Sequence, residues 1–420
     1  MIDLKLLREN PDAVREALKR RGSQVALEPL LAREKERRRL ITEIEQQRSE
    51  QKKASEAFGR QKAAGTVTAP PAHLKPLSDQ IKGKEEQLKQ VEERIERDVA
   101  FLPNIPHSSV PSGDAKANQV VRAIGQKPAY SFLPKTHMEL GDRLGLIDFE
   151  RAAKISGSHF PLFTGVGARL ERALINWMLD VQTKEHGYTE IAPPYLVNRA
   201  SMFSTGQLPK FEEDMYRLKD VDLFLVPTAE VPLTNLHRDE ILEESQLPIR
   251  YTGYTACFRR EAGSYGKETR GLVRVHQFDK VELVKFVKPE TSYDELERLV
   301  KDAETILQRL GLHYRVVSLA SGDLSFAAAK CYDLEAWAPG LNQFLEVSSC
   351  SNFEAFQARR ANIRYRPADT KKVAHVHTLN GSGVALARTL ICLLETHQRA
   401  DGHVTIPEPL RKYLDGQDVL

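Results

Sequence analysis

The hydrophobic positions are sparse between residues 27 and 64, whereas between residues 74 and 95 they recur at the spacing of a helix that packs along one narrow seam. In the second half the seam advances by three, four, seven, three and four residues, and Lys84 stands at the missing position. The residues of this seam are Leu74, Leu77, Ile81, Leu88, Val91 and Ile95. Before it, the stretch GTVTAPPA ends the first helix, because two consecutive prolines cannot continue one. We therefore predict an antiparallel coiled-coil hairpin over about residues 27–100, with helices of about 30 residues and about 45 Å.

The pattern alone leaves the role of this hairpin open. A structural or dimerising coiled coil and a ligand-binding arm would share the same seam, because a charged outer surface is typical of any solvated helix. A shorter helix over residues 10–22 precedes the hairpin, with an asparagine cap, a proline in its first turn and a glycine after its end. The segment FLPNIPHSSVPSG, residues 101–113, is rich in proline, serine and glycine and marks a boundary.

Beyond this boundary, patterns typical of strands and helices alternate. Helices are predicted over residues 167–187, 292–311 and 384–398. Strands are predicted within residues 188–197, 223–237, 250–261, 272–287, 314–323, 331–339 and 344–353. Short strands in sequence, with helices at the ends, indicate an antiparallel α+β sheet rather than a doubly wound parallel one.

Composition narrows the class of protein without identifying it. With 420 residues, of which 41% are hydrophobic and 28% charged, the chain can bury a sizeable core behind a soluble surface. No apolar run approaches the roughly 20 residues of a membrane span, and four acidic residues among the first 16 argue against a signal peptide. The four cysteines show no metal-binding spacing, so we expect neither zinc nor disulfides, and a cytoplasmic location.

The segment FRREAGSYGKETRGLVRVHQF, residues 258–278, places cations and glycines between two predicted strands. The chain has no P-loop or dinucleotide-binding glycine pattern, so a nucleotide would need side-chain cations and a sheet. Arg259 has the planar fork of donors that suits a phosphate, Glu261 is expected on the same strand face, and Phe278 could stack on a base. The basic middle of the segment could follow a nucleic-acid backbone. Viewed alone, the segment fits a solvated hairpin with salt bridges equally well.

Further motifs give the chain a resemblance to a known family. Three segments resemble motifs 1, 2 and 3 of the class II aminoacyl-tRNA synthetases, in that order: GYTEIAPPYL with Pro194, FRREAGSYGKETRGLVRVHQF, and NGSGVALARTLICLLETHQ with Arg388. Three others resemble signatures of the seryl-tRNA synthetase family of the common bacterial type: PTAE at 227–230, FDKVE at 278–282 and EVSSCSNFEAFQARR at 346–360. The resemblance covers essentially the whole chain.

This resemblance implies a division of labour along the chain. Residues 1–104 would form a helical tRNA-binding arm, and residues 105–420 a catalytic domain built on the class II antiparallel sheet flanked by helices. Two places depart from the pattern. Ala387 stands where the class usually has an acidic residue, a change that the seryl family shares. Ser325 and Phe326 stand where the family tends to have a smaller turn, so no function is carried over to them.

For ATP, the resemblance implies that Arg259 contacts the α-phosphate and Arg388 the γ-phosphate, and that both stabilise the charge of the transition state. Glu261 and the backbone around Val275 would read the adenine, with Phe278 stacked on it. The full set implied to bind ATP is Arg259, Arg260, Glu261, Val275, Phe278, Glu346, Val347, Ser348, Ser349 and Arg388.

A magnesium ion is also implied, held by Glu346 and Ser349, because Mg²⁺ prefers oxygen ligands. A buried structural role is the alternative for Glu346. No general base is required for activation, because the carboxylate of the amino acid is already an anion. We therefore interpret His276, within the motif 2 segment, as a structural hydrogen-bonding residue.

The serine-binding residues implied by the resemblance are Thr228, Ala229, Glu230, Glu282 and Ser382. A pocket that hydrogen-bonds the serine hydroxyl rejects alanine and glycine, because its polar groups would be left unpaired. Threonine would be excluded by size. Ordinary salt bridges remain the alternative for Glu230 and Glu282.

The function implied is that of a serine–tRNA ligase, which forms seryl-adenylate from serine and ATP and transfers the seryl group to the 3′ end of tRNA(Ser). Charging of tRNA(Sec) stays open. The coiled-coil arm would contact the tRNA by shape and backbone, and the motif 2 loop would guide its acceptor end. Motif 1 implies a homodimer. The alternatives are a ligase of the same fold that charges a carrier protein, and a non-catalytic RNA-binding relative.

Overall fold

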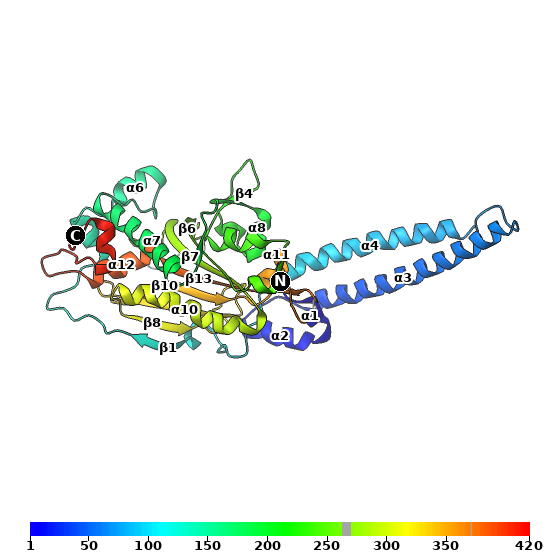
Figure 1. The fold of residues 1–420 in the computed structure, drawn as a ribbon, viewed down its shortest axis with the longest axis horizontal. Helices are drawn as coiled ribbons and strands as arrows, with labels where there is room; N and C mark the ends of the chain where they lie inside the picture. Colours follow the sequence, from blue (N-terminus) through cyan, green and yellow to red (C-terminus); the bar gives the residue numbers. More distant parts are fainter. Residues whose placement is uncertain (263–269, 371) are drawn as a thin grey trace. The chain divides into compact units, whose positions relative to one another are not determined.

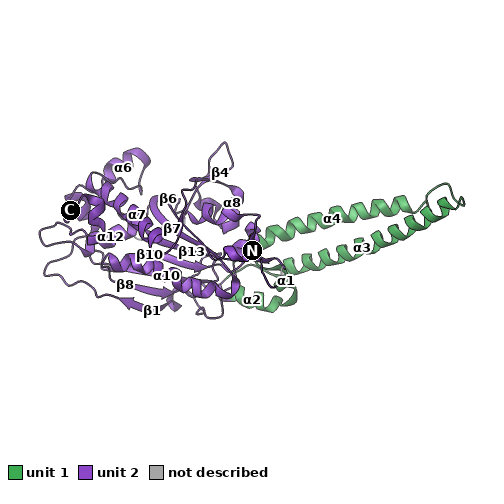
Figure 2. Cartoon of the chain, viewed as in Figure 1, with its two compact units in different colours: residues 1–19, 23–103 green, residues 20–22, 104–420 purple. Residues whose placement is uncertain are grey.

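The computed structural model describes residues 1–262, 270–370 and 372–420. The chain divides into two compact units (Figure 2). Unit 1 comprises residues 1–19 and 23–103, and unit 2 comprises residues 20–22 and 104–420. None of the described helices combines the length and the apolar character needed to cross a membrane.

Unit 1 is helical and is dominated by a two-helix hairpin (Figure 1). The first four helices of the chain are α1 (Leu4–Glu9), α2 (Pro11–Arg20), α3 (Glu28–Ala63) and α4 (Leu74–Ala100). The long helices α3 and α4 pack against each other, and the predicted seam of α4 supplies its buried residues Ile81, Val91 and Ile95. Lys84 lies half-buried at the missing seam position, and its Nζ is 2.8 Å from Oε2 of Glu43 on α3. The predicted hairpin is therefore present, with an ion pair at the gap in its apolar seam.

An eight-stranded sheet forms the centre of unit 2, with the strand order β1-β8-β9-β10-β13-β7-β6-β2 (Figure 1). Neighbouring strands are antiparallel except for the short β2, which pairs in parallel with β6. The strands are β1 (Gln119–Ile124), β2 (Thr189–Glu190), β6 (Ile249–Phe258), β7 (Gln277–Val287), β8 (Tyr314–Ser318), β9 (Lys330–Ala338), β10 (Gln343–Asn352) and β13 (His377–Ala385). The predicted class, an α+β protein with an antiparallel sheet, is confirmed.

Helices and smaller sheets surround this sheet. The helices are α5 (His137–Arg143), α6 (Phe149–Ser156), α7 (Val166–Lys184), α8 (Arg199–Thr205), α9 (Glu230–Thr234), α10 (Ser292–Arg309), α11 (Phe356–Ala361), α12 (Leu386–Thr396) and α13 (Glu408–Arg411). The minor strands are β3 (Leu196–Asn198), β4 (Leu223–Leu225), β5 (Ile241–Glu243), β11 (Arg364–Arg366) and β12 (Ala374–His375). The main core joins the apolar faces of α7, α10 and α12 to the sheet, so these helices hold its strands in place.

Five strand predictions were wrong in part. The segment predicted over residues 188–197 is strand only at β2 and at the start of β3, and the one predicted over residues 314–323 is a strand only to Ser318. The segment predicted as a strand over residues 223–237 is a strand only to Leu225, and α9 begins at Glu230. Residues 272–276 precede β7 as irregular backbone, because contacts with distant elements replace strand pairing there. Finally, β6 ends at Phe258, and Glu261 has a left-handed backbone with φ of 51°. Glu261 therefore does not share a strand face with Arg259.

The buried seam of the hairpin generates a stability prediction. Ile95 is 2% exposed, so Ile95→Ala should leave a cavity and lower the free energy of unfolding by about 3 kcal/mol. Denaturant titration followed by the helical circular dichroism signal measures this change. Replacement of the adjacent, exposed Glu96 by alanine is the control and should change stability by less than about 0.5 kcal/mol. Equal effects of the two substitutions would contradict the assigned seam.

Candidate active site

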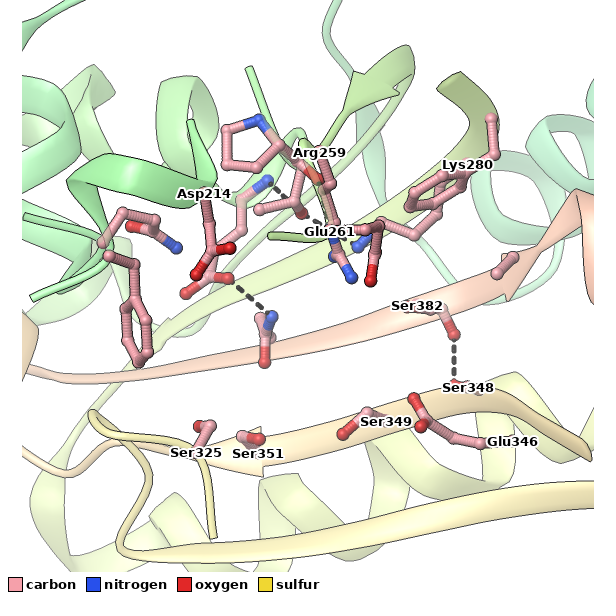
Figure 3. Close-up of a pocket in the computed structure, with 18 of the residues that line it drawn as sticks. Asp214, Arg259, Glu261, Lys280, Ser325, Glu346, Ser348, Ser349, Ser351 and Ser382 are labelled. Atoms are coloured by element: carbon pink, nitrogen blue, oxygen red, sulfur yellow. Dashed lines mark hydrogen bonds between the residues drawn. The ribbon is translucent and has the colours of Figure 1, made fainter. Parts of the chain in front are cut away.

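A cavity of about 640 Å³ opens beside β7, β10, β13 and the first turn of α12. Figure 3 shows Ser351, Ser349 and Glu346 in a row along one strand, β10. Most of the residues implied to bind ATP or serine line this single cavity: Thr228, Glu230, Arg259, Glu261, Val275, Phe278, Glu346, Val347, Ser348, Ser349, Ser382 and Arg388. The fold thus brings together side chains from all the motifs that carry candidate site residues.

Three of the implied site residues do not line the cavity. Ala229 is fully buried in an apolar cluster behind it. Arg260 is exposed, and its Nη1 donates to the carbonyl of Glu213 at 3.1 Å. Glu282 is fully buried, but it connects to the cavity through hydrogen-bonded neighbours.

Glu282 belongs to a buried polar cluster on β7. Lys280 and Glu282 are two residues apart and therefore point to the same face of the strand. Nζ of Lys280 lies 2.5 Å from Oε2 of Glu282 and donates to the hydroxyl of Thr228 at 2.9 Å. That hydroxyl donates in turn to Oε2 of Glu282 at 2.6 Å. The negative charge of Glu282 is thus compensated within the protein.

Glu230, the first residue of α9, is the second buried carboxylate of the cavity. Nε2 of Gln357 donates to its Oε1 at 2.6 Å. Oε1 of Gln357 accepts a hydrogen bond from the hydroxyl of Thr378 at 2.8 Å, so the orientation of the Gln357 amide is fixed. Burial, followed by the nearby charge of Glu282, raises the pKa of Glu230 to about 7.

Asn380 on β13 joins the two carboxylates. Its Nδ2 donates to Oε2 of Glu230 at 2.9 Å and to Oε1 of Glu282 at 3.3 Å. Because both neighbouring carboxylates are acceptors, the atom of Asn380 that faces them is assigned as the amide nitrogen, and the side-chain oxygen points away from them. That oxygen is buried and has no hydrogen-bond partner in the parts of the chain that the structure describes. An acceptor in this position is suited to a ligand that carries its own donor.

Two arginines approach the cavity from different elements, and each is anchored by backbone carbonyls. Nε of Arg259 donates to the carbonyl of Pro227 at 3.3 Å, and its guanidinium carbon lies 5.1 Å from the ring centre of Phe278. Arg388, in the first turn of α12, donates to the carbonyls of Val273 at 3.1 Å and Glu346 at 2.8 Å. Anchored guanidinium groups can receive an anion with little loss of conformational freedom.

Glu261 and His276 shape the backbone on this side of the cavity. The carboxylate of Glu261 forms an ion pair with Arg274. Nδ1 of His276 lies 2.9 Å from the carbonyl oxygen of Arg259, whose own amide donates to the carbonyl of His276. His276 therefore fixes the backbone at Arg259, in agreement with the structural role that we predicted for it.

The oxygens of β10 form the opposite wall. Glu346 is half-exposed, with Oε2 3.5 Å from Nη1 of Arg388, and Ser349 shares its side of the strand (Figure 3). Asp333 on β9 lies opposite Ser349 in the sheet register. Burial, together with the charge of Glu346, raises the pKa of Asp333 well above its usual range. Carboxylate and hydroxyl oxygens are the donors that Mg²⁺ prefers, so Glu346 and Ser349 fit this ion chemically. Within the described residues, no group of three or more His, Cys, Asp and Glu side chains could hold a metal.

Four residues of the site were missed in the sequence: Arg274, Lys280, Gln357 and Asn380. One of them carried a signal. Lys280 lies two positions before Glu282 in a predicted strand, so strand alternation places it beside a predicted ligand. Asn380 lies on β13, over residues that were not predicted as a strand. The contact of Arg274 with Glu261, and that of Gln357 on α11 with Glu230 on α9, depend on tertiary packing, which no local pattern shows. Residues 263–269, the middle of the motif 2 segment, lie outside the described residues, and their predicted contact with tRNA stays a prediction.

Comparisons with known proteins agree with this geometry. Residues 211–397 match the model of the tRNA synthetase class II core domain (G, H, P, S and T), and residues 1–106 that of the seryl-tRNA synthetase N-terminal domain. The serine–tRNA ligase of Thermodesulfovibrio yellowstonii is 53% identical, with all of both chains covered. The chain belongs to the seryl-tRNA synthetase family.

Two further members of the seryl-tRNA synthetase family extend the comparison. The serine–tRNA ligase of Geobacillus kaustophilus is 54% identical over the whole of both chains. The crystal structure of seryl-tRNA synthetase from Pyrococcus horikoshii complexed with ATP has a TM-score of 0.94 and 38% identity, and covers 100% of this chain and 99% of that one. The predicted family, the class II synthetase fold and the assignment as a ligase are confirmed. The roles of single residues remain predictions.

The buried ion pair of the site generates a second prediction. Lys280→Met should lower the free energy of unfolding of unit 2 by about 3 kcal/mol, because it leaves the carboxylate of Glu282 buried without a cation. Fluorescence-monitored denaturation measures this change, since both tryptophans, Trp177 and Trp337, lie in unit 2. The double variant Lys280→Met/Glu282→Gln should cost less than the sum of its two single substitutions. Strict additivity would show that the pair does not interact.

Proposed function

We propose that this chain is a serine–tRNA ligase whose cavity binds ATP and serine side by side. The observation that carries the proposal is the composition of one cavity: two carbonyl-anchored arginines face one part of it, and the buried carboxylate of Glu230, which Asn380 bridges to the fully buried Glu282, faces another. The first part suits a polyphosphate and the second a small cationic amine. A ligase that joins an amino acid to a nucleotide needs both in reach of each other.

In the proposed first step, ATP lies along the cavity with its adenine on Phe278 and beside Glu261 and Val275. Arg259 binds the α-phosphate and Arg388 the γ-phosphate. A carboxylate oxygen of serine attacks the α-phosphorus, and the bond from that phosphorus to the bridging oxygen breaks. Pyrophosphate leaves with the electron pair. The two arginines stabilise the charge that accumulates on the phosphate oxygens, and no proton has to be moved.

Glu346 and Ser349 are the residues proposed to hold Mg²⁺ on β10. Bound there, the ion would neutralise phosphate charge. The side-chain contact between Glu346 and Arg388 supports this proposal, because it brings the proposed metal ligand and a cation that can bind phosphate to the same wall.

Serine is proposed to bind between Glu230, Glu282 and Ser382. Its ammonium group would face the two carboxylates, whose positions are set by Asn380. The carbonyl of Asn380 would accept from either the ammonium or the hydroxyl group, which explains a buried acceptor without an internal partner. Alanine and glycine would leave the hydroxyl-binding groups unpaired and therefore bind more weakly.

In the second step, a ribose hydroxyl of the terminal adenosine of tRNA(Ser) attacks the seryl carbonyl of the adenylate. An ester bond forms, the bond between the carbonyl carbon and the phosphate oxygen breaks, and AMP and the hydroxyl proton leave. We propose that the coiled-coil hairpin of unit 1 contacts the body of the tRNA and that the motif 2 segment contacts its acceptor end. Assembly as a homodimer through motif 1 and a location in the cytoplasm complete the proposal. The sequence motifs and the family membership support these points.

The central test is serine-dependent exchange of labelled pyrophosphate into ATP. The unmodified protein should exchange with serine and not with alanine or glycine. Arg259→Ala and Arg388→Ala should each lower the exchange rate by about 10²- to 10³-fold, because each removes one partner of the phosphate charge. Arg366→Ala, an exposed arginine on β11 that does not line the cavity, is the matched control and should exchange normally. A folded protein that exchanges with no amino acid would overturn the proposal.

A pH dependence follows from the raised pKa of Glu230. Below pH 7 this carboxyl is largely protonated, and it must lose its proton before it can pair with the ammonium group of serine. The affinity for serine should therefore rise about tenfold from pH 6 to pH 8 and level off above it. Titration calorimetry in buffers of different ionisation enthalpy should detect proton release on binding at pH 6.

Glu230→Gln provides the control for this pH dependence. The variant should bind serine weakly at both pH values and release no proton. An affinity of the unmodified protein that does not change between pH 6 and pH 8 would contradict the assignment of Glu230 to the ammonium group.

A further inference from the structure

A buried histidine outside the proposed substrate pockets links two parts of the active site. His137, at the start of α5, is fully buried. Its backbone amide donates to Oε1 of Glu395 at 2.8 Å, and its Nδ1 lies 3.0 Å from the same oxygen. Glu395, near the end of α12, also accepts at Oε2 from the amides of Gly340 at 2.8 Å and Leu341 at 3.1 Å. This carboxylate thus fixes the imidazole against the helix that carries Arg388.

The other nitrogen of this imidazole holds the motif 2 segment. The amide of Leu272 donates to Nε2 of His137 at 3.2 Å, across 135 positions of sequence. Because Nδ1 faces a carboxylate and Nε2 faces an N–H, the neutral tautomer with its proton on Nδ1 satisfies both contacts. Gly271 makes the approach possible, since a Cβ at that residue would lie 2.2 Å from Nε2.

Both ends of α12 therefore hold the same short stretch of backbone. Near its end, Glu395 acts through His137 on the amide of Leu272. In its first turn, Arg388 donates directly to the carbonyl of Val273. Residues 272–275 line the cavity, and they lead from the motif 2 segment into β7.

We propose that His137 is a positioning residue for ATP: it fixes residues 272–275 so that Arg388 and the backbone at Val275 meet the nucleotide in a defined geometry. The inference rests on the proposed function of the cavity. An apolar side chain would fill this fully buried space at lower desolvation cost. The imidazole of His137 differs from an apolar side chain in that its Nε2 accepts a hydrogen bond from the buried amide of Leu272, which lies outside the strands of the sheet.

Two substitutions separate the two nitrogens of the ring. In His137→Asn the side-chain amide reproduces the donor at Nδ1 but provides no acceptor at the position of Nε2. In His137→Gln the longer side chain carries an amide oxygen to about the position of Nε2. We expect His137→Asn to raise the KM for ATP in pyrophosphate exchange about tenfold, since a buried amide loses its acceptor, with the KM for serine unchanged. His137→Gln should restore most of the affinity for ATP.

The matched control is His397→Asn, a half-buried histidine whose Nε2 lies 2.7 Å from the carbonyl of Leu310, away from the cavity. It should leave both KM values unchanged, which separates positioning from general loss of stability.

If His137→Asn does not fold, Gly271→Ala tests the same contact, because the new Cβ displaces the imidazole ring from Leu272. The KM for ATP should again rise while the KM for serine stays unchanged.

The outcomes distinguish this inference from the function on which it rests. Absence of serine-dependent exchange in the unmodified protein would overturn the proposed function and the inference together. Normal exchange in the unmodified protein, with an unchanged KM for ATP in a folded His137→Asn or Gly271→Ala variant, would overturn the inference alone. An equal rise of both KM values would also overturn it, because it would indicate a general structural role.

Discussion

Two carboxylates are buried within one hydrogen-bond network, and the cost of their burial constrains the construction of the active site: burial first, and the charge of Glu282 second, raise the pKa of Glu230. Glu282 is compensated by Lys280, whereas Glu230 relies on neutral amides and keeps a raised pKa. Asn380 lies between them and donates to both. The two carboxylates thus differ in how their burial is offset: a cation pairs with Glu282, and amide groups donate to Glu230.

The antiparallel sheet makes this arrangement possible. Adjacent strands β7 and β13 each present alternate residues to the cavity, so that four polar positions lie close together without any loop having to enclose them. The arginine side of the cavity is built differently. Its arginines extend from the end of β6 and from the first turn of α12, and carbonyls of distant segments orient them. Adjacent strands hold the carboxylate side of the cavity, whereas tertiary contacts assemble the arginine side.

This difference explains how far the sequence could predict the structure. The heptad seam and the sheet class were visible in local patterns, whereas the motif residues that line the cavity were implied by the family resemblance. The prediction of a strand across residues 272–276 was wrong, although apolar and polar residues do alternate there. Contacts with His137 and Arg388, which are 135 and 115 positions away in the sequence, hold this backbone outside the sheet. The start of α9 at Glu230 was missed because the β-branched residues around it are typical of strands.

The ion pair between Lys84 and Glu43 has a consequence for the geometry of the hairpin. An uninterrupted apolar seam is nearly self-similar from one heptad to the next and would tolerate sliding of one helix along the other. The ion pair of the half-buried Lys84 forms in the observed alignment and is broken when one helix slides along the other, so it favours this alignment. The hairpin has a single defined reach, so any surface it presents stands at a constant distance along its axis.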